Sequence, residues 1–293
     1  TAARLSAEFF LSRKCVVVDE WHHAAAPTYK TIFGHLEHCY YRYGMTGTFF
    51  RSGDDALSMH ALLANTIYRI SSLELLQRGY LVPSYVVFVP VPGPKLRGVD
   101  SGFTTGHGRH GIHQHVLRQQ LVAHAAMLLW QLGRKVLILV GTKPQGHMLR
   151  KILLALLPGT PPGAEFESVE FVSTDAARAK QGRVLKSFEE SDEVKVLIGT
   201  SILGEGVDLP TADALVYARG EKAEVTLTQN IYRTCTAAPG KRNAVVVDFA
   251  DRHHRKLLRH SQERLRVYHG EPTFGVSVLQ DPRQLPGWLS QLI

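Results

Sequence analysis

Short apolar runs alternate along the chain with longer stretches in which apolar residues recur at helical spacing. In the first third, residues 15–18, 40–45 and 85–91 predict strands, and residues 27–39 and 56–78 predict helices. The later part predicts helices at 114–132, 146–157 and 176–190 and strands at 136–140, 167–172, 194–199, 214–218 and 244–249. Continuous apolar strands that alternate with helices are typical of a parallel sheet covered on both faces. The pattern therefore predicts an α/β fold with parallel sheets.

The composition changes between residues 90 and 111, where prolines and glycines replace apolar periodicity. We interpret residues 92–112 as a linker between a first domain at 1–91 and a second domain at 113–270. Residues 271–293 form a tail that is rich in proline and glycine, with one expected strand at 274–279.

The overall composition is that of a globular protein. The chain has 293 residues, of which 44% are hydrophobic and 20% are charged, which leaves room for about two domains. No run approaches eighteen apolar residues, and the beginning of the chain lacks the basic-then-apolar pattern of a signal peptide. The three cysteines are widely spaced, which argues against a disulfide framework or a zinc site. We expect a reducing, cytoplasmic or nucleoid-associated setting.

The charge balance favours a polyanionic partner. Lysine and arginine total 34 against 26 aspartate and glutamate residues, which gives a formal net charge of +8. Phosphate contacts in nucleic-acid complexes are made largely by lysine and arginine.

An acidic pair, Asp19-Glu20, directly follows the first expected strand. Parallel α/β sheets bind ligands beyond the carboxyl ends of their strands. Two carboxylates at such a place suit divalent-metal binding together with activation of a water molecule. The alternative is a solvated acidic turn at an ordinary strand end.

The surroundings of this pair resemble a known family. The run Asp19-Glu20-Trp21-His22, followed by residues 44–51, resembles motifs II and III of superfamily 2 helicases. Residues 136–142 look like motif IV, and residues 196–210 resemble motif V. Residues 229–241 resemble motif VI. The nearest likeness is to the DExH branch found in phage repair helicases and restriction-type translocases.

The resemblance implies two RecA-like domains, the first incomplete at its N-terminus, and an ATP-dependent helicase or translocase that uses ATP and Mg²⁺. It implies that Asp19 holds Mg²⁺, that Glu20 polarises the attacking water and that His22 relays the nucleotide state. It also implies that Thr46 and Thr48 couple the two domains.

For the second domain, the resemblance implies one set of residues for nucleic acid and another for the nucleotide. Nucleic acid, with DNA ahead of RNA, would contact Thr142, Lys143, Thr200 and Ser201. The nucleotide would be approached by Gly206, Asp208, Gln229 and Arg233. Arginine suits a triphosphate because it stays charged and offers forked donors to phosphate oxygens.

The sequence departs from the family pattern in two places. No Gly-Lys is followed by Ser or Thr, and only eighteen residues precede Asp19, so we expect the chain alone to bind ATP poorly. In motif VI, Tyr232 stands at the glycine position and Thr236 at the final arginine position. Two hypotheses follow. The chain is a fragment of an active helicase, inactive alone, whose first domain is completed by a further segment. Alternatively, it is a degenerate, non-catalytic module for nucleic-acid binding or assembly.

Two further features are given structural interpretations. The histidines at 107, 110, 113 and 115 are taken as a polar loop rather than a metal site. Residues 251–266 predict an amphipathic helix with a basic, solvated face, and contact with a nucleic-acid backbone is the alternative.

Overall fold

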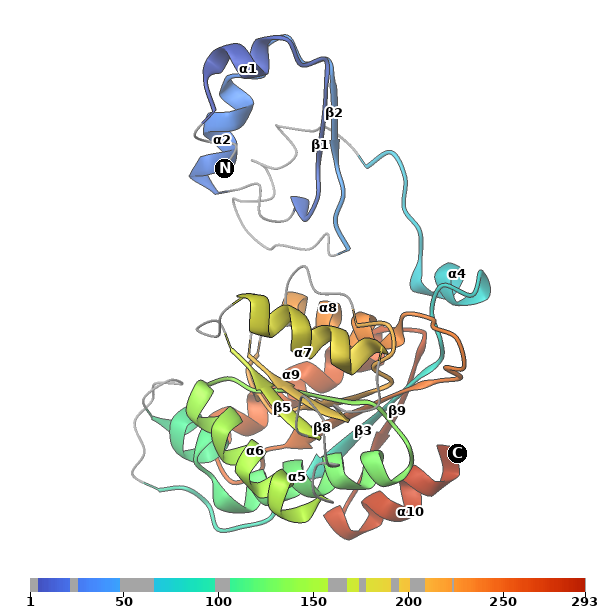
Figure 1. Ribbon diagram of the computed structural model, residues 1–293. Coiled ribbons are helices and arrows are strands. Elements are labelled where there is room, and N and C mark those ends of the chain that lie inside the picture. The colour runs from blue at the N-terminus through green and yellow to red at the C-terminus, as the bar shows by residue number, and fades with distance from the viewer. Residues whose placement is uncertain are drawn as a thin grey trace. The chain divides into compact units, whose positions relative to one another are not determined.

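The computed structural model describes residues 5–21, 26–47, 66–97, 106–157, 168–173, 178–190, 195–200, 209–222 and 224–292 (Figure 1). The chain divides into two compact units, Thr1–Ile70 and Ser71–Ile293. No helix in the described ranges is long and apolar enough to cross a membrane.

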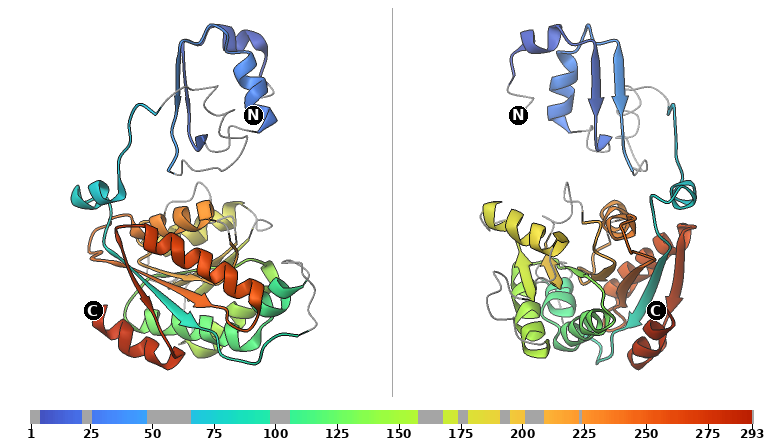
Figure 2. Two further views of the ribbon diagram at one scale, coloured as in Figure 1. Left: turned by 180° about the vertical axis from the view of Figure 1, so that it is seen from behind. Right: turned by 45° about the vertical axis from the view of Figure 1, so that its right-hand side comes forward.

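The first unit contains a two-stranded parallel sheet. Strand β1 (Cys15–Val18) pairs with β2 (Tyr41–Gly44), so that Val18 lies opposite Gly44. Helices α1 (Ala7–Leu11) and α2 (Pro27–Gly34) lie on one side of these strands (Figure 2). A small core holds the unit together, formed by Phe10, Trp21, Phe33, Leu36 and Cys39. The strands predicted at 15–18 and 40–45 are confirmed.

The second unit is built on a seven-stranded sheet with the order β5-β6-β4-β7-β8-β3-β9, in which all neighbours run parallel. The strands are β3 (Ser84–Pro90), β4 (Val136–Leu139), β5 (Val169–Val172), β6 (Val196–Gly199), β7 (Ala214–Tyr217), β8 (Ala244–Ala250) and β9 (Phe274–Val278). Every strand predicted in this part of the chain is confirmed, including the expected strand at 274–279.

The division between the units lies before residue 92, not at the expected linker of residues 92–112. Strand β3 was placed in the first domain, but it pairs with β8 on one side and with β9 on the other. A strand buried on both faces gives the same apolar run in either domain, so its sequence did not show which sheet it joins. Part of the expected linker is also packed. Residues 109–113 form a π-helical turn, η3 (Arg109–His113), in which Gly111, Ile112 and His113 are buried.

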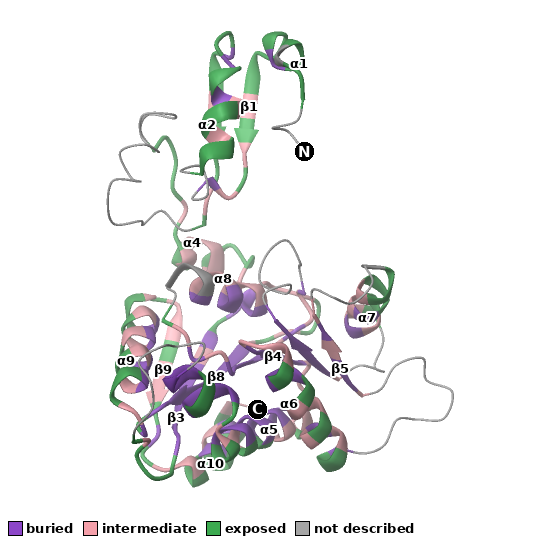
Figure 3. Ribbon diagram, turned by 90° about the vertical axis from the view of Figure 1, so that its left-hand side faces the viewer, coloured by how far each residue is buried: buried purple, intermediate pink, exposed green. Residues whose placement is uncertain are grey.

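Helices cover both faces of the larger sheet, and β3 shows how the chain divides between them. Val87 and Val89 point into a core shared with α5 (Val116–Gln131) and α6 (Lys143–Leu156). Val86 and Phe88 point into the opposite core, as expected for successive residues of a strand. The buried strands between the two helical layers are purple in Figure 3.

The remaining helices complete these layers. They are α4 (Ser72–Gln77), α7 (Arg178–Glu190), α8 (Glu224–Cys235), α9 (Arg255–Gly270), α10 (Leu285–Leu289) and the 3₁₀ turns η5 (Pro282–Gln284) and η6 (Ser290–Leu292). Helix α4 occupies the end of the helix predicted at 56–78, and residues 51–65 lie outside the described ranges. Helix α8 was not predicted. Its buried Leu227, Ile231 and Cys235 recur every four residues, which was the available signal.

The basic helix predicted at 251–266 corresponds to α9, but one of its arginines faces inward. Arg264 is fully buried, and its Nε and Nη2 donate to the two carboxylate oxygens of Asp248 at 2.8 and 3.0 Å. The Tyr268 hydroxyl donates to the same carboxylate at 2.7 Å. These contacts fix α9 against β8, so the solvated-face interpretation is wrong for Arg264.

Arg264→Met is expected to lower the free energy of unfolding by about 3–5 kcal/mol, because it leaves the Asp248 carboxylate buried without its cation. Urea unfolding followed by circular dichroism measures the change. Arg259→Met is the matched control on the same helix. Its side chain is 68% exposed and pairs with Glu263, so a loss below about 1 kcal/mol is expected. Equal losses in the two variants would contradict the assignment.

Candidate functional site

The acidic pair of the first unit lies in a sharp turn at the carboxyl end of β1. The Asp19 carboxylate accepts a hydrogen bond from the backbone N–H of Glu20 at 2.8 Å. Glu20 has a φ of +49°, the only positive φ of a non-glycine residue in the described ranges. L-residues adopt this left-handed backbone at a cost, and such strain is concentrated at functional sites.

Parallel pairing brings this turn beside the segment that follows β2. The Met45 N–H donates to the Val18 carbonyl, and the Trp21 N–H donates to the Met45 carbonyl, both at 2.8 Å. Thr46 follows directly. Two segments separated by more than twenty residues thus meet at the carboxyl ends of β1 and β2. His22 and Thr48 lie outside the described residues.

In the second unit, the predicted nucleic-acid residues follow two adjacent parallel strands. Thr142 comes after β4 and caps helix α6, where its hydroxyl accepts the Gln145 N–H at 3.4 Å. Thr200 comes after β6, the direct neighbour of β4. Among the described residues, the buried Thr200 hydroxyl has no hydrogen-bond partner. Lys143 is half-buried at the first turn of α6, and Ser201 lies outside the described residues.

The buried side chain of Gln145 holds the β4 end in place, a role that sequence reasoning missed. Its carbonyl oxygen accepts the Gly141 N–H at 3.0 Å, and its amide donates to the Ala218 carbonyl at 3.1 Å. The loops after β4 and β7 are thereby tied together. Its position three residues after the Thr142 cap was the signal that could have drawn attention to it.

Two predicted nucleotide residues share one face of α8. Gln229 and Arg233 are four positions apart, one helical turn, and both are half-buried. Leu227 and Ile231 anchor the opposite side of the helix in the core. Gly206 and Asp208 lie outside the described residues.

The chain is also similar to known proteins. Residues 119–238, which lie within the second unit, match the family described as "Helicase conserved C-terminal domain". Over 250 residues the chain is 23% identical to "Putative helicase 22" of Sulfolobus islandicus filamentous virus, covering 84% of this chain and 44% of that protein.

Solved structures show that the fold is that of two-domain RecA-like helicase cores. The fragment structure of "a putative HsdR subunit of a type I restriction enzyme" from Vibrio vulnificus matches with a TM-score of 0.64 at 19% identity, over 92% of this chain and 48% of that one. A Saccharomyces cerevisiae Dbp5 variant bound to RNA and ADP BeF3 matches with a TM-score of 0.60 at 14% identity, over 95% of this chain and 63% of that one. The chain therefore spans less than half the length of the viral relative and of the HsdR fragment.

The two departures in motif VI have structural roles in the second unit. The Tyr232 hydroxyl is hydrogen-bonded to Glu271 and Ser72, and burial and the Glu271 contact raise the pKa of this phenol. Its ring packs against Phe274 with centroids 5.8 Å apart. The Thr236 hydroxyl donates to the Tyr232 carbonyl at 3.2 Å, so it bonds back to the last turn of α8 itself. Tyr232 therefore joins α8 to its surroundings, and Thr236 fixes the end of the helix.

The histidines of residues 107–115 are part of the domain's packed interior, so the polar-loop interpretation is wrong for two of them. His107 and His113 are buried, and His107 stacks on His254 with ring centroids 5.1 Å apart. His113 lies against the end of β4, where a Cβ on Gly141 would come within 2.7 Å of its Nε2. No group of three or more metal-ligating side chains in the described ranges could hold a metal ion.

His113 is expected to make the second unit less stable at acidic pH. Burial, with the charges of Arg118 and Arg219, lowers its pKa from 6.5 to about 4. The unfolded chain therefore binds a proton that the folded chain excludes, and stability falls as the pH drops from about 6.5 towards 4. By about pH 5.5 the loss from this residue reaches about 1 kcal/mol.

Urea unfolding of the wild type and of His113→Gln, at neutral pH and at about pH 5.5, measures this contribution. The variant should lose less stability than the wild type on acidification. The same acid sensitivity in both proteins would contradict a neutral, buried His113.

Proposed function

We propose that the chain belongs to an ATP-dependent helicase or translocase of superfamily 2, which couples ATP hydrolysis to movement on nucleic acid. The observation that carries the proposal is the Asp19-Glu20 turn, because it presents two carboxylates at the end of parallel strands on a left-handed backbone. An ordinary solvated turn does not require that conformation.

The first unit would supply the groups that act on water and metal. Asp19 is exposed, and its carboxylate suits Mg²⁺, which is usually held by one or two carboxylates together with water and substrate phosphates. Bound Mg²⁺ would offset the negative charge of the phosphates. Glu20 would orient and deprotonate the attacking water, and Thr46 beside it would couple this site to the other domain.

The second unit would supply the groups that recognise phosphate. Arg233 and Gln229 would donate to the triphosphate from one face of α8. Thr142, Lys143 and Thr200 would contact the nucleic-acid backbone from the ends of β4 and β6. Support comes from the unpartnered hydroxyl of Thr200 and from the Dbp5 structure, which holds RNA and a nucleotide analogue. DNA is the proposed partner, with RNA as the alternative in every binding assay.

A non-catalytic binding or assembly module is the second candidate function. It is favoured by Tyr232 and Thr236, whose side chains make structural contacts where the family pattern has glycine and arginine. This candidate shares the nucleic-acid contacts and lacks ATP turnover.

Nucleic-acid-stimulated ATP hydrolysis separates the two candidates. The assay compares this chain with an extended version to which an upstream segment carrying a Gly-Lys-Ser/Thr loop has been added. Turnover by the extended version alone, rising with added DNA or RNA, is the expected result. Nucleic-acid binding without turnover in either protein would instead establish the binding module.

A further inference from the structure

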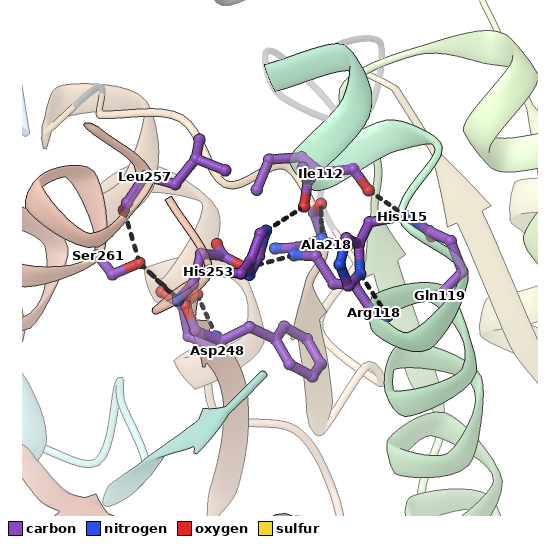
Figure 4. A network of polar contacts seen from close by, with 12 residues as sticks. Ile112, His115, Arg118, Gln119, Ala218, Asp248, His253, Leu257 and Ser261 are labelled. Carbon is purple, nitrogen blue, oxygen red and sulfur yellow. Dashed lines mark hydrogen bonds and ion pairs between the residues drawn. The ribbon is translucent and has the colours of Figure 1, made fainter. Parts of the chain in front are cut away.

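Three segments meet beyond the ends of β3 and β8. Residues 94–97 follow β3, residues 106–113 precede α5, and residues 251–260, far along the chain, run from the end of β8 into the first turns of α9. The Leu96 N–H donates to the His253 carbonyl at 2.8 Å, and a ring nitrogen of His253 is 2.9 Å from the Gly111 carbonyl oxygen. His253 thus touches both of the other segments, and Figure 4 shows it between the turn that carries Ile112 and the start of α9.

This junction is too closely packed to rearrange easily. A Cβ on Gly111 would lie 2.3 Å from Leu257 Cδ1 and 3.1 Å from both His253 Nε2 and Leu96 Cδ1. Beneath it, the fully buried Arg118 donates to Asp251 and to the Ala218 carbonyl, both at 2.8 Å (Figure 4). The Ser261 hydroxyl accepts the Asp251 N–H at 3.1 Å. Side chains that leave this junction therefore start from fixed backbone positions.

The exposed side chains of the junction are strongly cationic. They include Lys95, Arg97, Arg109, Arg252, Arg255 and Lys256, and we call this set the basic junction. The carboxylate nearest to it in sequence, Asp251, is fully buried and paired with Arg118, and it is the only acidic residue within the three segments. Within the described ranges, Arg97, Arg109 and Arg255 form no ion pair. The positive charge of these three arginines is therefore not neutralised by an ion pair with any described residue.

The basic junction continues the sheet edge that carries the predicted phosphate contacts. Strands β4, β7, β8 and β3 are consecutive neighbours, so their ends span roughly 14 Å at ordinary strand spacing. Segment 106–113 links the ends of β4 and β8, since His113 lies against Gly141 after β4 and Gly111 contacts His253 after β8. A polyanion held at Thr142 and Lys143 can thus extend along one edge of the second unit to α9.

We propose that the basic junction is a second contact surface for the nucleic-acid backbone, read through its phosphates and independent of base sequence. It rests on the proposed function only in requiring that the chain binds nucleic acid. None of the residues in the basic junction belongs to the motifs II to VI identified in the sequence. Its role is to hold the backbone beyond the strand ends of β4 and β6.

The test replaces one cation from each segment in Arg97→Gln/Arg109→Gln/Arg255→Gln. The matched control removes the same charge from exposed positions elsewhere, in Lys151→Gln/Lys180→Gln/Lys186→Gln. Fluorescent DNA and RNA, as duplexes and as single strands, are titrated over a range of salt concentrations. All six positions are exposed, so both variants should keep the wild-type melting temperature.

For duplex DNA, the junction variant is expected to bind at least about tenfold more weakly than the wild type. The slope of log affinity against log salt should become less steep by about 3, because each lost phosphate contact contributes about 0.9. On single strands the change in slope should be about 2. The control variant should retain nearly the wild-type slope. Equal affinity of the junction variant and the control would overturn the proposal.

Two further measurements separate this proposal from membrane binding and from the proposed function. Vesicles of anionic phospholipid are tested as another phosphate surface, and loss of vesicle binding with unchanged nucleic-acid binding would overturn the proposal in favour of a membrane. Lys143→Gln tests the other surface. Weaker binding by Lys143→Gln with no effect of the junction variant would leave the proposed function standing and remove the second surface. If the wild type binds neither DNA nor RNA, the nucleic-acid part of the proposed function falls too.

Discussion

Under the proposed function, Arg233→Ala is expected to lower the ATP turnover of the extended version by about 10³-fold or more. Arginines that stabilise the charge of a transferring phosphoryl group contribute about 10³–10⁵ to the rate. Arg233 is the single cation on α8, and the proposed function places it at the triphosphate. Nucleic-acid-stimulated phosphate release, measured at saturating ATP, reports the loss.

Arg266→Ala is the control for this substitution, because Arg266 is an exposed arginine on the neighbouring helix α9. It should leave turnover within about twofold of the wild type, as expected for a surface change away from the site. Arg233→Lys keeps the charge but loses the forked donors, and is expected to recover only part of the rate. Turnover of Arg233→Ala equal to that of the control would remove Arg233 from the active site.

Under the proposed function, Glu20→Gln is expected to lower the ATP turnover of the extended version by about 10²–10⁴-fold, the usual range for loss of a general base. Glutamine keeps the size of the side chain, so ATP binding and the melting temperature should be retained while phosphate release is lost. Glu37→Gln, an exposed glutamate of the same unit, is the control and should behave as the wild type.

The backbone conformation of Glu20 also predicts that its glycine and glutamine variants differ in melting temperature. Its left-handed backbone favours glycine, so Glu20→Gly should raise the melting temperature of the first unit while it removes activity. A Glu20→Gln protein with full turnover would show that another group activates the water.

Most strands and helices followed from periodicity because each is an uninterrupted apolar run or an amphipathic stretch of ordinary length. Strand β3 was located correctly as a strand and assigned to the wrong domain. Its partners β8 and β9 lie far along the chain, and local sequence does not report which buried strands pair. The loop interpretation of residues 106–113 failed for a related reason. The glycines and prolines there were interpreted as a linker, whereas Gly111 permits close packing against Leu257.

The residues proposed for the site come from short motifs, the adjacent pair Asp19-Glu20 and the pair Gln229 and Arg233, which are one helical turn apart. The buried ion pairs that fix the surrounding elements could not be predicted from the sequence. Asp248 and Arg264 are sixteen positions apart, and Arg118 and Asp251 are separated by most of the second unit. A buried arginine in a basic helix has the same local sequence as an exposed one. The sequence of α9 therefore does not show that Arg264 is buried, because its partner Asp248 lies on β8.

The register of β3 has a consequence for how the chain is made. Ser84 lies opposite Ala244 on one side and Phe274 on the other, so this largely apolar, buried strand emerges from the ribosome long before either neighbour exists. Until β8 is synthesised, its edges and both its faces are open to other chains, a state prone to aggregation. Expression that begins at residue 92 or 113 would omit the strand altogether and leave β8 and β9 with no strand between them. A segment expressed to obtain the second unit by itself therefore has to start before Ser84 and end after Val278.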